Sequence, residues 1–360
     1  MKIYFYPYAS LRDRQLDTIR NWPSREVVSP KVSDKRRGVQ VSAAYAEASI
    51  LRKSWKLFFP LINIKLRPRK APKDAVIYVW GAVVATGSFI VDLDNPWSLT
   101  GYNLRAMPLY RPILRYILAS SRCLEIRCMS EACHLSVKVL FGSAVYDKAR
   151  VHYPCIPQVV SRVALATPDS CHFLFVGTQF EIKGGEALLK AFRRMHEKVP
   201  SARLDVITHF PTKYIDLAES CAGIHVHEAR FSRDEIHTQF MSQADVLVLP
   251  TYAESFGMVA LEGLAHGLAV IATDVYALRE IVEDGKNGRL LTPPISIWDG
   301  VLPSRNSYDF EYIKEHIEKM DTTIFERQLE KAMQELVTDL EFRLAARQAS
   351  VRIMKARFTC

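Results

Sequence analysis

The chain has 360 residues, of which 49% are hydrophobic and 24% are charged. This balance is typical of a folded globular protein and excludes the disordered, collagen-like and low-complexity classes. A single hydrophobic core stops growing at roughly 250–300 residues, so we expect two domains. The net charge of +9 indicates an anionic partner but does not identify it.

The positive charge lies in the first part of the chain. Residues 1–150 contain 25 Lys and Arg against 11 Asp and Glu, a balance of +14, whereas residues 151–360 have a balance of −5. Basic residues surround the apolar, aromatic stretch 55–64; they are Lys53, Lys56, Lys65, Arg67, Arg69, Lys70 and Lys73. This composition suits docking on an anionic membrane, and a core-facing helix followed by a solvated basic loop explains it equally well. No recognition motif for nucleic acid accompanies the charge, so we do not expect nucleic acid as a partner.

The targeting and cysteine patterns favour a cytoplasmic protein, at most peripheral on the inner face of the cell membrane. The start, residues 1–12, is too short and interrupted for a signal-peptide core, and no apolar run approaches the roughly 18–20 residues that span a bilayer. Seven scattered cysteines indicate reduced thiols. Cys123, Cys128, Cys133 and His134 lack the spacing of a metal site, so no metal is expected there.

Strands and helices alternate along the first half. The apolar patterns predict strands at 2–6, 74–80, 88–93 and 126–130, and helices at 45–59, 109–120 and 131–141. Two prolines in 151–157 and an unperiodic stretch to residue 170 predict a linker. The first half is therefore expected to form one α/β domain.

The second half alternates more clearly. The patterns predict strands at 171–177, 204–207, 245–250 and 269–272, and helices at 185–199, 233–242, 256–266 and 277–283. A turn follows at 284–288, and the segment 310–358 is an amphipathic helical tail. Strands alternating with helices of this length predict a parallel sheet, here a Rossmann-like domain over about 165–300.

One segment, residues 250–263, carries chemistry. A predicted strand ends at Pro250, a short loop holds Glu254, and a helix begins near Phe256. The amides of 257–259 then point into the crevice at the strand's carboxyl end, where parallel sheets bind ligands and helix N-termini favour phosphate. Glu262 lies where its carboxylate can accept two hydrogen bonds from a diol such as ribose. Two ordinary solvated helix charges are the alternative interpretation of this Glu pair.

A second segment, residues 175–185, adds a cation. Gly177 at a strand end permits close backbone approach, and Lys183, just before Gly184 and a helix, supplies a point charge for phosphate. The segment is neither a Walker loop nor a dinucleotide-binding fingerprint, and a surface Lys beside a helix-entry glycine is the alternative.

Together these segments resemble the retaining GT-B glycosyltransferases of family GT4. Their order and spacing agree over about residues 173–291, and the two Glu residues separated by seven others, Glu254 and Glu262, are the most specific element. The segments 127–130, 149–154 and 356–358 match more loosely. The resemblance implies an α/β GT-B fold, with two Rossmann-like domains facing each other across a cleft. It divides the chain into an acceptor-binding domain (1–155), a nucleotide-sugar domain (165–340) and a last helix (341–360) that crosses back to the first domain.

The resemblance also implies a function. The protein would transfer a hexosyl group, with retention, from a UDP- or GDP-sugar to a glycan or lipid-linked glycan, as in bacterial-type surface polysaccharide or lipopolysaccharide biosynthesis. Neither a metal nor another cofactor is expected, because preorganised positive groups would meet the charge of the leaving diphosphate. The catalytic candidates are Glu254 for the donor sugar, Lys183 for the diphosphate, and Asp94. The donor-binding candidates are Gly177, Thr178, Lys183, Gly184, Ser255, Phe256, Gly257, Met258, Val259 and Glu262.

Two departures from the family pattern leave alternatives open. Thr178 stands where the family usually has Arg, so either another arginine such as Arg230 replaces it or the leaving group is stabilised less. The family's His near the donor sugar is missing, and Asp92 or Asp94 occupies its place; we favour Asp94. These departures make a non-catalytic GT-B partner subunit an alternative. A GT-B sugar-nucleotide epimerase is the other alternative, against which the Glu pair argues.

Overall fold

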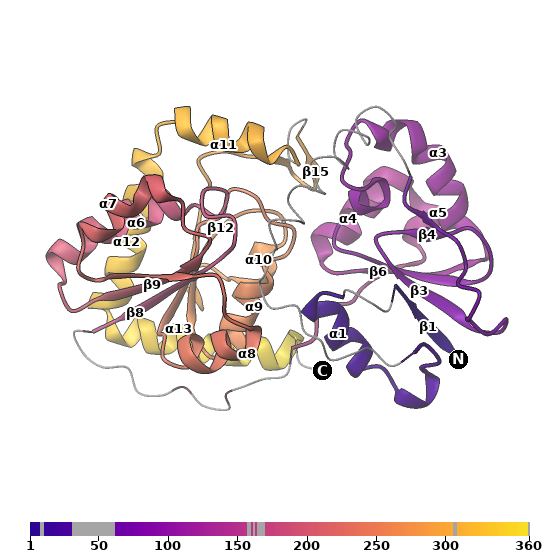
Figure 1. Ribbon diagram of the computed structural model, residues 1–360, viewed down its shortest axis with the longest axis horizontal. Helices are drawn as coiled ribbons and strands as arrows, with labels where there is room; N and C mark the ends of the chain where they lie inside the picture. Colours follow the sequence, from indigo (N-terminus) through magenta and orange to yellow (C-terminus); the bar gives the residue numbers. More distant parts are fainter. Residues whose placement is uncertain are drawn as a thin grey trace. The chain divides into compact units, whose positions relative to one another are not determined.

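The protein, described here from a computed structural model, divides into two compact units, Met1–Cys155 and Ile156–Cys360 (Figure 1). The structure describes residues 1–7, 11–30, 62–156, 160, 163, 170–304 and 308–358. The predicted helix 45–59 lies outside the described residues, as do Lys53, Lys56 and most of the apolar stretch 55–64, whereas Lys65, Arg67, Arg69, Lys70 and Lys73 are described. Each unit is described by itself.

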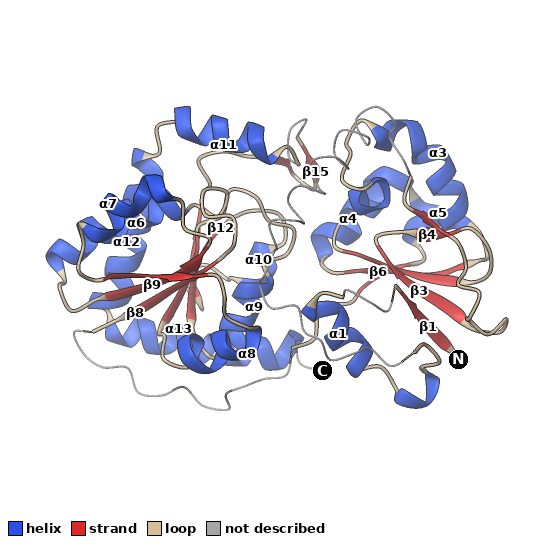
Figure 2. Ribbon diagram, viewed as in Figure 1, coloured by secondary structure: helices blue, strands red, loops and turns tan. Residues whose placement is uncertain are grey.

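Unit 1 is built on a parallel sheet with strand order β1-β3-β5-β6-β7. Val27 forms a parallel bridge to Ile3 on the side of β1 that faces away from β3. The strand order therefore reverses here, because the chain passes from β1 to Val27 on one side and then to β3 on the other. Helices α3, α4 and α5 lie on one side of the sheet and α1 on the other (Figure 2). The elements are β1 Ile3–Tyr6, α1 Asp13–Arg20, η1 Ser24–Glu26, β2 Ile64–Lys65, β3 Val76–Trp80, β4 Val83–Val84, β5 Phe89–Leu93, η2 Pro96–Thr100, α3 Ala106–Ala119, β6 Cys123–Cys128, α4 Glu131–Phe141, α5 Ser143–Tyr146 and β7 Ala149–Val151.

Unit 2 contains a six-stranded parallel sheet with the order β10-β9-β8-β11-β12-β13. In chain order this is 3-2-1-4-5-6, the Rossmann arrangement. The central strands are continuous apolar runs because helices cover both of their faces (Figure 2). The elements are β8 His172–Val176, α6 Gly185–Lys198, β9 Arg203–Thr208, η3 Thr212–Tyr214, α7 Ile215–Glu219, β10 Ile224–Glu228, α8 Arg233–Glu235, η4 Ile236–Met241, β11 Val246–Leu249, α9 Met258–Ala265, β12 Ala269–Thr273, α10 Leu278–Ile281, β13 Gly288–Leu291, β14 Trp298–Asp299, β15 Leu302–Pro303, α11 Phe310–Lys319, α12 Thr323–Thr338, α13 Leu340–Ile353 and η5 Met354–Phe358.

Two predicted helices differ in detail. The segment 233–242 is a short α-helix, α8, that continues as a π-helix, η4. The tail 310–358 is three α-helices and a π-helical turn, since the carboxylates of Asp309 and Asp339 accept the amides of Tyr312 and Phe342 and start new helices. The crossing of residues 341–360 onto the first domain stays a prediction.

Helix α13 is fastened to the amino edge of the unit 2 sheet by buried arginines. Arg343 donates to the carbonyl of Ser170, which precedes β8. Arg347 pairs with Asp245, which precedes β11, at 2.6 Å and also donates to the carbonyl of Gly267. The helix thereby ties together the starts of strands whose other ends form the candidate site.

The state of the cysteines differs at one residue from the expectation of reduced thiols. Cys123, Cys128, Cys133, Cys171 and Cys221 are buried free thiols. Cys155 is disulfide-bonded, so the expectation of reduced thiols is wrong at this residue. Within the described ranges, no helix combines the length and the apolarity needed to cross a bilayer, and no group of three or more His, Cys, Asp or Glu is arranged to hold a metal ion.

The buried ion pair between Arg347 and Asp245 makes a testable contribution to stability. Arg347→Ala leaves the Asp245 carboxylate without its cation, and we expect the free energy of unfolding to fall by about 3–5 kcal/mol in urea titrations followed by circular dichroism. The control Arg352→Ala removes an exposed arginine from the same helix and should change it by no more than about 0.5 kcal/mol. Equal effects of the two variants would contradict the assignment.

Candidate functional site

The predicted site residues of unit 2 gather where its strand order reverses. Strands β8 and β11 are neighbours in the sheet, and the chain leaves them in opposite directions along it. Open parallel sheets bind ligands in the crevice outside the carboxyl ends of two such strands. The segments that follow β8 and β11 are those identified in the sequence, 177–185 and 250–263.

The two segments touch because one of their residues has no side chain. A Cβ on Gly184 would lie 2.1 Å from the carbonyl oxygen of Pro250, and the φ of Gly184 is +75°. A hydrogen bond from the Tyr252 amide to the carbonyl of Ile182 joins the same segments at 2.9 Å. Glycine is therefore required at residue 184, and the contact brings the residue before it next to the β11 loop.

That residue, Lys183, forms an ion pair with Glu254. Its Nζ lies 2.8 Å from Oε2 of Glu254 and 3.0 Å from the carbonyl oxygen of Ala253. A Cβ on Gly177 would lie 3.1 Å from Cγ of Lys183, so this glycine leaves room for the lysine side chain. Both charged side chains keep 19% exposure, which leaves them accessible to a ligand.

The Glu254 carboxylate also binds two backbone amides at the end of the loop before α9. Its Oε1 accepts the amides of Ser255 at 3.0 Å and Phe256 at 3.4 Å. Gly257, with a φ of +96°, then turns the chain into the helix. The next amides, those of Met258 and Val259, belong to the first turn, which supplies no acceptors of its own. The sequence grouped 255–259 as one binding segment, whereas the structure divides it between the carboxylate and the helix N-terminus.

Burial and charge act in opposite directions on the Glu254 carboxyl. Burial raises its pKa, but the Lys183 ammonium and the amides of Ser255 and Phe256 together hold the pKa below its ordinary value. The site therefore presents an ionised carboxylate beside an ammonium group.

Glu262, the second predicted carboxylate, is held by residues that sequence reasoning missed. Arg233 Nε lies 2.7 Å from its Oε1, and His237 Nε2 lies 3.7 Å from its Oε2. Burial raises the pKa of Glu262, whereas His237 and Arg233 lower it, so the net pKa is below the ordinary value. Arg233 begins the helix that follows β10, so the capping sequence 232–235 at a strand's carboxyl end was the available signal.

The residues linked to the two departures from the family pattern are Thr178 and Arg230 in unit 2 and Asp92 and Asp94 in unit 1. Thr178 lies half-buried on the loop after β8. Arg230 is exposed, with its guanidinium 6.0 Å from the Phe231 ring. In unit 1, the Asp92 carboxylate is buried between Arg14 and Tyr78, each at 2.7 Å. Asp94, just after β5, keeps partial exposure and accepts the Tyr102 hydroxyl.

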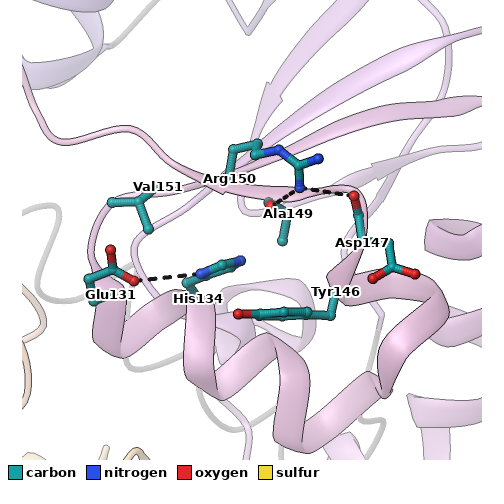
Figure 3. Close-up of a pocket in the computed structure, with 7 residues that line it drawn as sticks. All are labelled: Glu131, His134, Tyr146, Asp147, Ala149, Arg150 and Val151. Carbon is teal, nitrogen blue, oxygen red and sulfur yellow. Dashed lines mark hydrogen bonds and ion pairs between the residues drawn. The ribbon is translucent and has the colours of Figure 1, made fainter.

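Unit 1 also has a pocket that the sequence did not reveal (Figure 3). It has a volume of about 560 Å³ and lies between the start of α4, the end of α5 and β7. The His134 ring stacks on Tyr146 at 4.3 Å, with Nδ1 3.6 Å from Glu131. The lining residues are Glu131, His134, Tyr146, Asp147, Ala149, Arg150 and Val151. The exposed groups of Glu131 and Arg150 can hydrogen-bond a hydroxyl-rich ligand.

The fold is that of the GT-B glycosyltransferases. It is similar to the crystal structure of WaaG, a glycosyltransferase involved in lipopolysaccharide biosynthesis, with a TM-score of 0.55, 15% identity, and coverage of 98% of this chain and 95% of that one. It is also similar to Anabaena HepE in complex with UDP and glucose, with a TM-score of 0.60, 13% identity, and coverage of 100% and 96%. At these identities the likeness shows the fold alone.

Sequence comparison defines the candidate-site region more closely. Residues 170–299 match the family model "Glycosyl transferases group 1". The D-inositol 3-phosphate glycosyltransferase of Paenarthrobacter aurescens is 33% identical over 132 residues, which are 34% of this chain and 32% of the relative. That of Arthrobacter sp. is 34% identical over 140 residues, or 36% and 33%. The chain thus spans about a third of the length of the curated relatives it matches. The match to this family model lies within unit 2.

The ion pair predicts a specific pH dependence. Because the native pKa of Glu254 is lowered, its ionisation contributes stability above the ordinary carboxyl pKa of about 4.5, and this contribution is lost as the pH falls through the lowered value. In Lys183→Met the pKa of Glu254 should rise, since burial is then opposed only by two amides. The wild type should therefore lose more stability on acidification than this variant, measured by urea unfolding at a series of pH values.

The matched control for that experiment is Lys331→Met, which removes an exposed lysine from α12. It should follow the wild-type pH profile. Parallel profiles for the wild type and Lys183→Met would show that the ammonium does not govern Glu254.

Proposed function

We propose that this protein is a retaining glycosyltransferase that transfers a hexosyl group from a UDP- or GDP-sugar to a glycan or lipid-linked glycan acceptor. The observation that carries the proposal is the Lys183–Glu254 pair at the strand-order reversal of a glycosyl transferase group 1 domain. The structure of HepE with UDP and glucose supports a nucleotide-sugar donor. Lipopolysaccharide biosynthesis, the setting of WaaG, supports a role in surface polysaccharide synthesis.

The chemistry follows from charge. When the bond between the sugar's anomeric carbon and the phosphate oxygen breaks, negative charge develops on the leaving diphosphate. The Lys183 ammonium and the first-turn amides, Met258 and Val259, meet that charge with groups already in place. This arrangement supplies by itself the positive charge that a bound metal ion would otherwise provide. Glu254, beside Lys183, accepts hydroxyls of the donor sugar, and Glu262 accepts those of the ribose.

The acceptor is assigned to unit 1. Its oxygen bonds to the anomeric carbon on the face that the phosphate leaves, and its proton passes to the departing phosphate oxygen. The pocket beside α4 offers Glu131 and Arg150 to hold hydroxyl groups. Asp94 is the candidate for the missing N-terminal histidine, because Asp92 is buried between an arginine and a tyrosine.

The donor assignment predicts a nucleotide-dependent rise in melting temperature. Screening against UDP, GDP, ADP and dTDP should give a shift for at least one, because a ligand that binds only the native state stabilises it. Lys183→Ala should lose most of that shift, whereas the exposed control Lys331→Ala should retain it. A full shift in Lys183→Ala would refute the diphosphate assignment.

Glu254→Ala separates binding from transfer. It should keep much of the nucleotide-dependent shift but reduce the release of nucleoside diphosphate from the sugar nucleotide by about a hundredfold or more, measured with a coupled phosphate assay. If the wild type releases no nucleoside diphosphate from any common sugar nucleotide, and Glu254→Ala leaves the cell's glycans unchanged, the non-catalytic subunit is the better explanation. Conversion of the sugar nucleotide to its epimer would instead identify an epimerase.

We further propose cytoplasmic localisation, with docking on an anionic membrane surface through α3. The inner face of this helix is buried through Met107, Leu114 and Leu118. The opposite face is also apolar, with Leu109, Ile113 and Tyr116 exposed to 62%, 49% and 77%. Apolar side chains thus face outward as well as inward, and an exposed apolar stripe of this kind can mark an interaction surface.

The charge of α3 supports an anionic surface. The helix has no acidic residue, and its two arginines, Arg111 and Arg115, are exposed. A cationic helix with an exposed apolar stripe suits the headgroup region of an anionic bilayer. This support is independent of the basic segment around 55–64.

The α3 assignment predicts selective sedimentation. The protein should pellet with phosphatidylglycerol vesicles but not with phosphatidylcholine vesicles, and less of it should pellet at high salt. Leu109→Glu with Ile113→Glu should abolish pelleting, whereas the control Ile324→Glu, at a residue of unit 2 that is 75% exposed, should not. Unchanged pelleting of the double variant would contradict docking through α3.

A further inference from the structure

Glu262 lies at the centre of a group of cationic and imidazole side chains drawn from α8, η4 and the end of α9. Arg233 starts α8, His237 lies in the π-helix η4, and His266 follows α9 directly. The Arg233 guanidinium contacts one carboxylate oxygen at 2.7 Å, and His237 faces the other at 3.7 Å. The edge of the His237 ring meets His266, with ring centroids 4.9 Å apart and planes at 83°. This group surrounds the carboxylate assigned above to the ribose.

The group has unused hydrogen-bonding capacity. His237 Nε2 is buried and too far from Glu262 for a hydrogen bond. Both ring nitrogens of His266, a residue only 4% exposed, have no hydrogen-bond partner among the described residues. Burial lowers the pKa of His266 to about 4, so this ring is neutral near pH 7. Buried polar atoms are normally paired, so polar groups from a ligand or water are needed to complete the network.

The helix that carries His237 is itself unusual. Residues Ile236–Met241 are π-helical, and the extra residue in such a turn changes which side chains face a neighbouring element. π-Helical turns are rare and are frequently found at functional sites. Here the turn carries the histidine that faces the carboxylate of α9.

We infer that Arg233 is a positioning residue that holds the Glu262 carboxylate for the two hydroxyls of the donor's ribose. The inference rests on the proposed function. The Arg233 Nε–H takes one lone pair of Oε1 and fixes the direction of the carboxylate. The remaining lone pairs then accept hydrogen bonds from a vicinal diol. Arg233 does not need to touch the reacting atoms.

This assignment gives Arg233 a different role from that of the arginine which the family usually has where this chain has Thr178. An arginine that replaced the family's second phosphate ligand would bind the diphosphate whether or not the ribose carried hydroxyls. The Arg233 Nε–H instead donates to the carboxylate of Glu262, so the contribution of Arg233 to nucleotide affinity should depend on the diol. The dependence on the ribose hydroxyls is what distinguishes the two roles.

The experiment compares a nucleotide with and without the diol. Isothermal titration calorimetry on the full chain measures the affinity for UDP and GDP and for their 2′,3′-dideoxy forms. Arg233→Met should weaken binding of the diol-containing nucleotide about tenfold, which corresponds to a loss of about 1.4 kcal/mol, and leave the affinity for the dideoxy form unchanged. Arg327→Met is the control. It removes the same charge from an exposed side chain of α12, and should change neither affinity.

Each outcome decides the question. Equal weakening of both nucleotides in Arg233→Met would overturn the inference in favour of phosphate binding or a general structural role, and no weakening would overturn it outright. Arg233→Lys, which keeps the charge but lacks the planar Nε–H, should lose affinity for the diol form only, and provides the test if the Met variant does not fold. If the wild type binds neither UDP nor GDP, the proposed function fails together with the inference.

Discussion

The candidate site depends on the contact between Gly184 and the carbonyl of Pro250. A side chain at residue 184 would collide with this carbonyl at 2.1 Å, so the loops after β8 and β11 could not meet. Their meeting pairs Lys183 with Glu254, which keeps a partly buried carboxylate ionised and places an ammonium group near the N-terminus of α9. The Rossmann strand order makes the contact possible, because it sets these two strands side by side with their connections leaving in opposite directions.

At the amino ends of the same strands, helix α13 is bound to the sheet by two arginines. Arg347 pairs with Asp245 just before β11, and Arg343 binds the backbone just before β8. The last α-helix therefore stabilises the starts of the two strands whose ends form the site. The residues at the amino ends of these strands therefore contribute to stability without forming part of the candidate site.

Much of this arrangement could be predicted from the sequence. The apolar runs of β8, β11 and β12 and the two Glu residues separated by seven others are local patterns. They predicted the parallel sheet and Glu254 as a site residue, but not the ion pair between Glu254 and Lys183. Contacts between distant segments have no such pattern. Nothing local indicates that Arg233 reaches Glu262, that η4 is π-helical, or that the pocket beside His134 exists, because each depends on how separate elements pack. The roles assigned to Thr178 and Asp94 stay predictions.

The central claim is that the nucleotide-sugar binds at the carboxyl ends of β8 and β11. Amide hydrogen exchange with and without UDP or GDP, read by mass spectrometry, tests this claim most directly. The account predicts that nucleotide slows exchange in peptides covering 177–185 and 254–262, and leaves the amino-edge segments before β8 and β11 unchanged. Protection confined to other segments, or no protection at saturating concentrations of either nucleotide, would contradict it.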